Sequence, residues 1–139
     1  ARVRDVSEWL AGIGLREGRR PVDAVVTYQD SCHLAHAQKI RAAPRLLLAA
    51  VPRLRFVELP SAEICCGSAG IYNVVQPEMA DAILHSKMED INATGAGIVA
   101  TANPGCLLQL RYGVARWGRG QRVLHVIEIL DEAYREPAP

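Results

Sequence analysis

Short apolar runs rich in β-branched residues alternate along this chain with longer segments in which apolar residues recur at helical spacing. The β-branched density of the runs predicts four strands, at residues 22–28, 54–59, 97–102 and 122–126. The periodic segments predict a helix after each strand, at residues 44–51, 78–94, 103–117 and 127–135. A strand followed by a helix, repeated four times, is typical of a parallel sheet, because each right-handed crossover returns the chain to the same edge.

The expected fold is therefore a three-layer, Rossmann-like α/β domain, in which helices cover both faces of a parallel sheet of about four strands. Proline and glycine mark the helix ends: Pro44 and Pro77 fit first helical turns, and Gly95 fits a helix stop. Asn103 is the expected N-cap of the helix that follows it. Residues 33–42 are polar and aperiodic, so they are expected to be irregular.

The first twenty residues are charged and only loosely patterned. Asp5 to Glu8 resembles a capping box for a short helix that Gly14 would end, and a basic linker follows. We expect residues 1–20 to form this N-terminal helix and linker, and residues 21–139 to form the main domain. Because the chain begins with Ala rather than Met, we expect it to be a fragment of a longer polypeptide.

Composition limits the classes of function that this chain can have. Half of its 139 residues are hydrophobic but only 5% are aromatic, so the core must consist mainly of Ala, Val, Leu and Ile. A net charge of +1 argues against a nucleic-acid partner. The longest aliphatic run, residues 46–51, is too short to cross a bilayer, and no signal-peptide pattern opens the chain. A cytoplasmic domain with no transmembrane segment is expected.

All four cysteines of the chain follow predicted strands. Cys32 comes after the first strand, Cys65 and Cys66 after the second, and Cys106 after the third. Since ligands of parallel sheets bind beyond the carboxyl ends of the strands, the four thiols are expected at one edge, where they can form a single site. Adjacent residues of a strand point to opposite faces, so the cysteine pair can serve one centre only if Gly67 lets the chain bend.

The compartment favours metal or redox chemistry for these thiols over structural disulfides, because the cytosol keeps thiols reduced. Helix N-termini lower thiol pKa values and favour the thiolate, which binds metal, so Cys106 and Cys66 are expected to gain from them. Two adjacent cysteines suit a cluster of several iron atoms better than one small tetrahedral ion. Four further residues are expected to support the thiols or to add a ligand: His36, His125, Asn103 and Gly67.

Other interpretations of the cysteines stay open. A buried cysteine can be no more than a small hydrophobic residue. Zinc is possible, although Gln109 stands where the partner of Cys106 in a Cys-x-x-Cys knuckle would be. The domain could also cycle between thiol and disulfide, or dock a partner without holding metal. The glycine-rich pieces form no dinucleotide fingerprint. The sequence pattern does not show where His33 lies relative to the thiols.

Three motifs carry a resemblance to a known family: Cys32, the triplet Cys65-Cys66-Gly67, and the turn Asn103-Pro104-Gly105-Cys106. They resemble the cysteine-rich CCG domain of heterodisulfide reductase and related iron–sulfur proteins, and are most similar to the C-terminal part of glycolate oxidase iron–sulfur subunits. That resemblance implies an iron–sulfur cluster on Cys32, Cys65, Cys66 and Cys106. Gln109 stands where the family commonly has a further cysteine, so the expected cofactor is a single [4Fe–4S] cluster, which needs four thiolates.

The same resemblance implies a role in electron transfer. A flavin-containing subunit would oxidise glycolate, and this domain would relay electrons towards a quinone-type acceptor, together with a ferredoxin-like N-terminal region of its own polypeptide. Such a complex could lie peripherally at the inner face of the membrane. The fragment alone is expected not to oxidise glycolate, and after aerobic preparation it is expected to have lost its cluster, to carry zinc or to be disulfide-linked.

Overall fold

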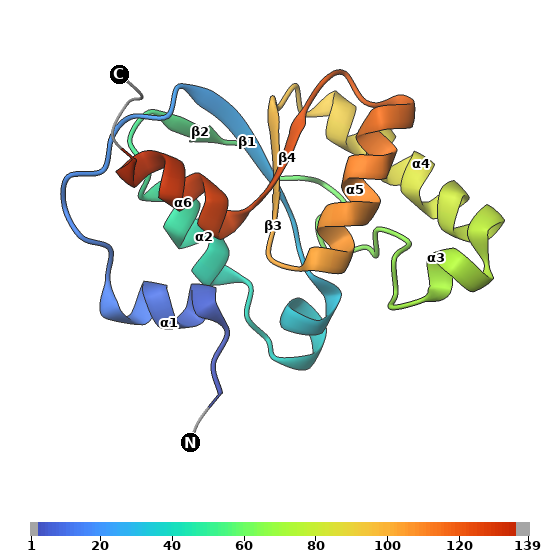
Figure 1. Cartoon of the computed structure of the whole chain (residues 1–139), viewed down its shortest axis with the longest axis horizontal. Coiled ribbons are helices and arrows are strands. Elements are labelled where there is room, and N and C mark those ends of the chain that lie inside the picture. Colours follow the sequence, from blue (N-terminus) through green and yellow to red (C-terminus); the bar gives the residue numbers. More distant parts are fainter. Residues whose placement is uncertain (1–2, 136–139) are drawn as a thin grey trace.

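The computed structural model describes residues 3–135 and contains a four-stranded sheet flanked by helices (Figure 1). In chain order the elements are α1 (Val6–Ile13), β1 (Ala24–Gln29), the π-helical turn η1 (His33–Ala37), α2 (Ala42–Ala49), β2 (Leu54–Phe56), α3 (Tyr72–Val75), α4 (Pro77–Ala93), β3 (Ile98–Thr101), α5 (Pro104–Trp117), β4 (Arg122–His125) and α6 (Val126–Tyr134).

All pairs of neighbouring strands are parallel, and the strand order is β2-β1-β3-β4. In the register, Val26 lies opposite Phe56 on one side and opposite Ile98 on the other. The chain thus runs outward from β1 to β2, then returns to β3 on the other side of β1. The strand order reverses between β1 and β3, which is where open α/β sheets form a crevice. The expected three-layer α/β fold is confirmed.

Alternate residues of each strand build two cores, because successive side chains point to opposite faces of a sheet. One face packs against α2 and α6, and α1 lies outside α2 (Figure 1). Its core joins aliphatic side chains to a single tyrosine and includes Val26, Tyr28, Ile98, Ala100, Leu47, Leu48, Ile129 and Leu130. The opposite face packs against α4 and α5, with a core that includes Val99, Val123, Leu84, Met88, Ile91, Leu110, Cys66 and Cys106.

The expected strand at residues 54–59 is shorter in the structure, where β2 ends at Phe56. Val57 still donates its N–H to the Val26 carbonyl, at 2.8 Å, but the pairing stops there. Glu58 turns outward to an ion pair with Arg45, and Leu59 crosses to the α4 and α5 core. Pro60 then supplies no donor. Competing side-chain partners therefore end the strand early.

The polar segment at residues 33–42 is not wholly irregular. Residues 33–37 form the π-helical turn η1, in which Gln38 donates its N–H to the His33 carbonyl at 3.1 Å. Leu34 and Ala35 are buried, and they fix the turn against the sheet. Five residues are too few to show helical periodicity, so the sequence pattern could not reveal the turn.

Several of the expected helix caps are confirmed. Asn103 is the N-cap of α5, with Pro104 in the first position, and Pro77 opens α4. Asp5 caps α1, but its carboxylate accepts from the N–H of Ser7 at 2.9 Å, not from that of Glu8. The reciprocal capping box lies elsewhere, at the start of α6. Between residues 3 and 135, the structure contains no helix that is both long and apolar enough to cross a membrane.

The layered core makes a direct prediction about α5. Leu110 is fully buried against the sheet, whereas Leu108 on the same helix is 66% exposed. Leu110→Ala should lower the free energy of unfolding by about 2–5 kcal/mol, because it leaves a cavity in the core. Leu108→Ala, the matched control, should change it by about 0.5 kcal/mol or less. Urea unfolding of the two variants measures the difference, and equal losses would contradict the packing described.

Candidate thiol site

A cavity of about 350 Å³ lies beyond the carboxyl ends of the strands, and all four cysteines line it. Three loops and the first turn of α5 complete its wall, which is lined by Asp30, Cys32, His33, Cys65, Cys66, Ser68, Ala69, Gly70, Asn103, Gly105 and Cys106. Its volume lies at the lower end of the range typical of ligand pockets. Cys66 and Cys106 are buried, whereas Cys32 and Cys65 are only partly covered. All four are free thiols.

Cys32 and Cys106 are positioned by the two strands that flank the reversal in strand order. Cys32 follows β1 and precedes η1. Cys106 lies in the first turn of α5, where the side chain of Asn103 accepts its N–H at 3.1 Å. Asn103 therefore fixes the helix start that carries the thiol, and it also lines the cavity.

Gly67 gives the Cys65–Cys66 pair the bend that two neighbouring thiols need to reach one site. Its φ is +90°, a conformation that L side chains rarely adopt. A Cβ atom at this position would lie 2.7 Å from the backbone oxygen of Ala80 in α4. The N–H of Gly67 donates to the Cys65 sulfur at 3.3 Å. The bend expected at Gly67 is thus present, and close packing against α4 adds a second reason for glycine.

The two buried thiols have opposite pKa shifts. A hydrogen bond from the Cys106 thiol lowers the pKa of Cys66 to about 7, despite its burial, and a backbone N–H at Ser68 adds to this effect. The pKa of Cys106 is raised, first because its thiol donates that hydrogen bond and then because it is buried. The expectation that the helix N-terminus favours a Cys106 thiolate is therefore wrong for the metal-free protein.

The histidines are arranged differently from the sequence-based expectation. His36 projects from η1, and its Nε2 donates to the Glu63 carbonyl at 3.2 Å instead of to a cysteine sulfur. His125 is the N-cap of α6, where its Nδ1 accepts the N–H of Ile127 at 3.2 Å. Neither residue lines the cavity, whereas His33 does. The only sequence signal that could have placed His33 in the cavity is its position next to Cys32, because η1 shows no periodicity.

Asp30 is a buried carboxylate that the sequence analysis did not single out. It follows β1 and lines the cavity, but both of its oxygens accept from the Arg45 guanidinium, at 2.9 and 3.0 Å. Arg45 also holds both carboxylate oxygens of Glu58, at 2.6 and 2.9 Å. Because Arg45 occupies the Asp30 oxygens, the thiols and the His33 imidazole are the available ligands in this cavity.

The donor set of the cavity is made of thiols: all four cysteines, from three segments of the chain, line it. Thiolates are the ligands of iron–sulfur clusters and of zinc, so the residues present fit either group. Within residues 3–135, no three side chains from His, Cys, Asp or Glu converge closely enough to hold one metal ion. Four buried side-chain atoms have no hydrogen-bond partner among the described residues, and none of them belongs to a residue that lines the cavity: Thr27 Oγ1, Gln29 Oε1, Ser31 Oγ and Thr101 Oγ1.

A buried ammonium group lies on α4, outside the lining of the cavity. Lys87 is 2% exposed, and burial lowers its pKa to about 8. In the described part of the chain it forms no ion pair with a carboxylate. The negative charge of Asp90, and after it those of the Cys66 and Cys65 thiolates, oppose its deprotonation.

Comparisons with known proteins agree with this architecture. The protein-family model for the cysteine-rich domain CCG matches residues 26–111. The "Probable glycolate oxidase iron-sulfur subunit" of Bacillus subtilis (strain 168) is 49% identical over 111 residues, which cover 78% of this chain and 25% of that protein.

Two further relatives are more distant. A fumarate reductase (CoM/CoB) subunit of Methanothermobacter marburgensis is 36% identical over 135 residues, or 96% of this chain and 28% of that protein. "Lactate utilization protein A" of Bacillus subtilis (strain 168) is 29% identical over 119 residues, or 86% of this chain and 50% of that protein. The chain therefore spans between a quarter and a half of the length of these relatives.

The backbone bend at Gly67 can be tested by substitution. Gly67→Ala should lower the free energy of unfolding by about 2–4 kcal/mol, because it adds the clash with Ala80 to the cost of a positive φ. Gly70→Ala is the matched control, since Gly70 has a φ of +70° but no atom within 4 Å of its would-be Cβ. It should cost about 1–2 kcal/mol. Urea unfolding of the metal-free proteins measures both changes. Equal losses of unfolding free energy in the two variants would contradict the close packing of Gly67 against Ala80.

Proposed function

Because this chain belongs to the cysteine-rich CCG domain family, we propose that it is the electron-transfer domain of an iron–sulfur subunit, with its cluster on Cys32, Cys65, Cys66 and Cys106. One observation carries the proposal: four thiols from three separate segments line one cavity. The names of two relatives support it, because both describe subunits of oxidoreductases and one specifies iron–sulfur. A bound cluster would take up and release single electrons.

The four proposed ligands differ in what they do before a cluster binds. Cys66 and Cys106 are buried and interact with each other, so this pair forms the inner wall of the site. Cys32 and Cys65 are partly covered and lie on the accessible side. An electron-transfer partner would therefore approach from the side of Cys32 and Cys65, where the least protein separates solvent from the site.

We propose a single [4Fe–4S] cluster as the specific cofactor. The side chain at position 109, where the family commonly has a further cysteine, is a buried glutamine that accepts from Asn73 at 2.9 Å. Gln109 does not line the cavity. Four thiolates remain, which is the number that one such cluster requires.

The partners and the location follow from the proposed role. A flavin-containing subunit would oxidise glycolate or a related 2-hydroxy acid and pass electrons to this domain, and a quinone-type acceptor would receive them. A ferredoxin-like region of the same polypeptide would lie on this route. In that arrangement residues 1–20 form a helix and linker ahead of the cysteine-rich domain, and the complex lies in the cytoplasm, at the inner face of the membrane. The domain alone carries no oxidase activity.

Loss of single thiols tests the ligand assignment. Reconstituted anaerobically, the wild-type domain should hold about four iron and about four sulfide per chain. Each of the four Cys→Ser variants should lose at least half of this iron while keeping its far-ultraviolet circular dichroism, because the aliphatic core is separate from the site. Ile71→Val, a change at a 71% exposed position that does not line the cavity, is the control and should bind like wild type. Stoichiometric zinc without sulfide, or full iron in any Cys→Ser variant, would contradict the proposal.

A thiol–disulfide role is the second candidate, and the hydrogen bond between Cys106 and Cys66 favours it. If the domain acts in this way, oxidised glutathione should remove two free thiols and yield a Cys66–Cys106 disulfide that reductant reverses. If the cluster is the functional group, the loaded protein should keep all four thiols protected, and releasing the iron in denaturant should free all four. Thiol counting with peptide mass spectrometry separates the two outcomes.

A further inference from the structure

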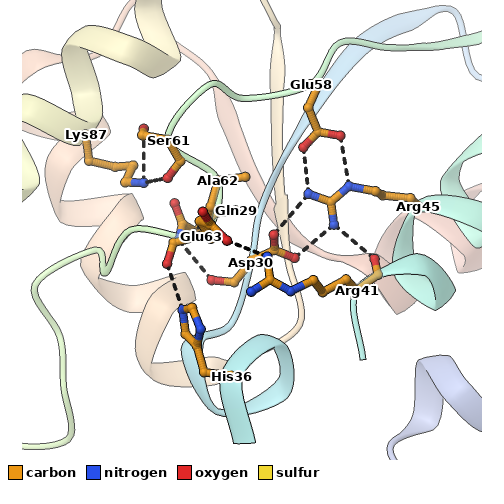
Figure 2. A network of polar contacts seen from close by, with 10 residues as sticks. All are labelled: Gln29, Asp30, His36, Arg41, Arg45, Glu58, Ser61, Ala62, Glu63 and Lys87. Atoms are coloured by element: carbon orange, nitrogen blue, oxygen red, sulfur yellow. Dashed lines mark hydrogen bonds and ion pairs between the residues drawn. The ribbon is translucent and has the colours of Figure 1, made fainter. Parts of the chain in front are cut away.

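The segment that carries the Cys65–Cys66 pair runs from β2 to α3 without regular secondary structure, yet its carbonyl groups are not left to solvent. Gln29, at the end of β1, contributes most to holding it. Its Nε2 atom lies 2.9 Å from the carbonyl oxygen of Ala62 and 3.0 Å from that of Ile64. It also lies 2.9 Å from the carbonyl oxygen of Asp30 (Figure 2). Gln29 is 1% exposed, so water cannot substitute for these contacts.

Lys87 holds the start of the same segment from the opposite direction. Its ammonium group, on α4, donates to the carbonyl oxygen of Ser61 and to its hydroxyl, the latter at 3.1 Å (Figure 2). The contact is buried. His36 donates to the Glu63 carbonyl at the surface. Four consecutive carbonyls, at residues 61–64, therefore each accept a side-chain donor, and those donors come from β1, η1 and α4.

We infer that Gln29 and Lys87 are positioning residues that fix the Cys65–Cys66 pair against Cys32 and Cys106 by clamping the backbone of residues 61–64. The inference rests on the proposed function for its purpose, but its geometry stands without a cluster. Gln29 lies three positions before Cys32 on the same strand end, so one amide ties two of the three thiol-bearing segments together. Lys87 joins that pair of segments to α4.

The clamp can be tested on the metal-free, reduced protein. Cys66 is 1% exposed, so iodoacetamide can reach it only when the segment opens. Gln29→Met, which preserves volume but removes the amide, should increase the alkylation rate of Cys66 tenfold or more relative to that of Cys106. Peptide mass spectrometry measures the ratio. An unchanged ratio would overturn the role of Gln29.

Gln121→Met is the matched control for general destabilisation. Gln121 is also a buried glutamine, and its amide makes hydrogen bonds with Asn92 and Arg119 beside the start of β4, at the other end of the sheet. Gln121→Met should lower the melting temperature as Gln29→Met does. It should nevertheless change the ratio of Cys66 to Cys106 alkylation less than twofold. If both variants raise the ratio equally, the effect is global and the clamp is disproved.

The contribution of Lys87 to the clamp is measured in the same alkylation assay. Lys87→Met removes both donated hydrogen bonds to Ser61, so it should raise the ratio of Cys66 to Cys106 alkylation tenfold or more, while Lys39→Met at the surface should change it less than twofold. A ratio equal to wild type in Lys87→Met would overturn the role of Lys87. If no variant and not even the wild type binds iron and sulfide, the proposed function fails, and the alkylation ratios still decide the clamp.

Discussion

The parallel pairing of β1 with β3 is the constraint on which the position of every thiol depends. These strands are central, and the chain leaves their carboxyl ends for opposite faces of the sheet, β1 towards α2 and β3 towards α5. The crevice between the two departing segments is thus a result of topology, not of any one side chain. Cys32 and Cys106 are the cysteines that follow these two strands, so the reversal in strand order brings them to one cavity although 73 intervening residues separate them.

The Cys65–Cys66 segment receives little such help from the sheet: one backbone hydrogen bond, from the N–H of Asp30 to the Ala62 carbonyl at 3.0 Å, joins it to the end of β1. β2 lies at the edge and ends early, so the segment must be anchored by side chains. Gln29 and Lys87 supply donors to its carbonyls, and Arg45 ties Asp30 to Glu58 at its start. The donors of these groups meet acceptors, which avoids the cost of about 1–3 kcal/mol for an unpaired buried polar group, although the Gln29 Oε1 has no partner among the described residues. Stability of the fold and placement of the site are therefore achieved by different chemistry.

The sequence predicts the elements of this fold well because its signals are local. β-branched runs, the Asn103-Pro104 helix start and the glycine after α4 each act over a few residues, and their outcome does not depend on distant parts of the chain. The gathering of the thiols follows from topology alone. By contrast, nothing local distinguishes Gln29 from a polar residue at a strand end, or Lys87 from a solvated lysine on a helix. The π-helical turn, the contact of Gly67 with Ala80 and the hydrogen bond of Cys106 to Cys66 also depend on tertiary packing. The backbone partners of His36 and His125 depend on tertiary packing too, so sequence spacing could not show them.

The clamp also bears on which group the cavity can accept. A tetrahedral zinc ion binds thiolates at about 2.3 Å, which requires all four sulfur atoms to lie within about 3.8 Å of one another. Cys66 and Cys106 already meet through a hydrogen bond, but no third ligand of this kind converges on them in the part of the chain that the structure describes. To bind zinc with all four thiols, the Cys65 and Cys32 segments would have to close on the cavity. The contacts of Gln29 with the carbonyls of Ala62 and Ile64 resist that closure, because they hold the cysteine-pair segment at the end of β1. The proposed clamp would therefore make the site discriminate by size between a multi-atom cluster and a single ion.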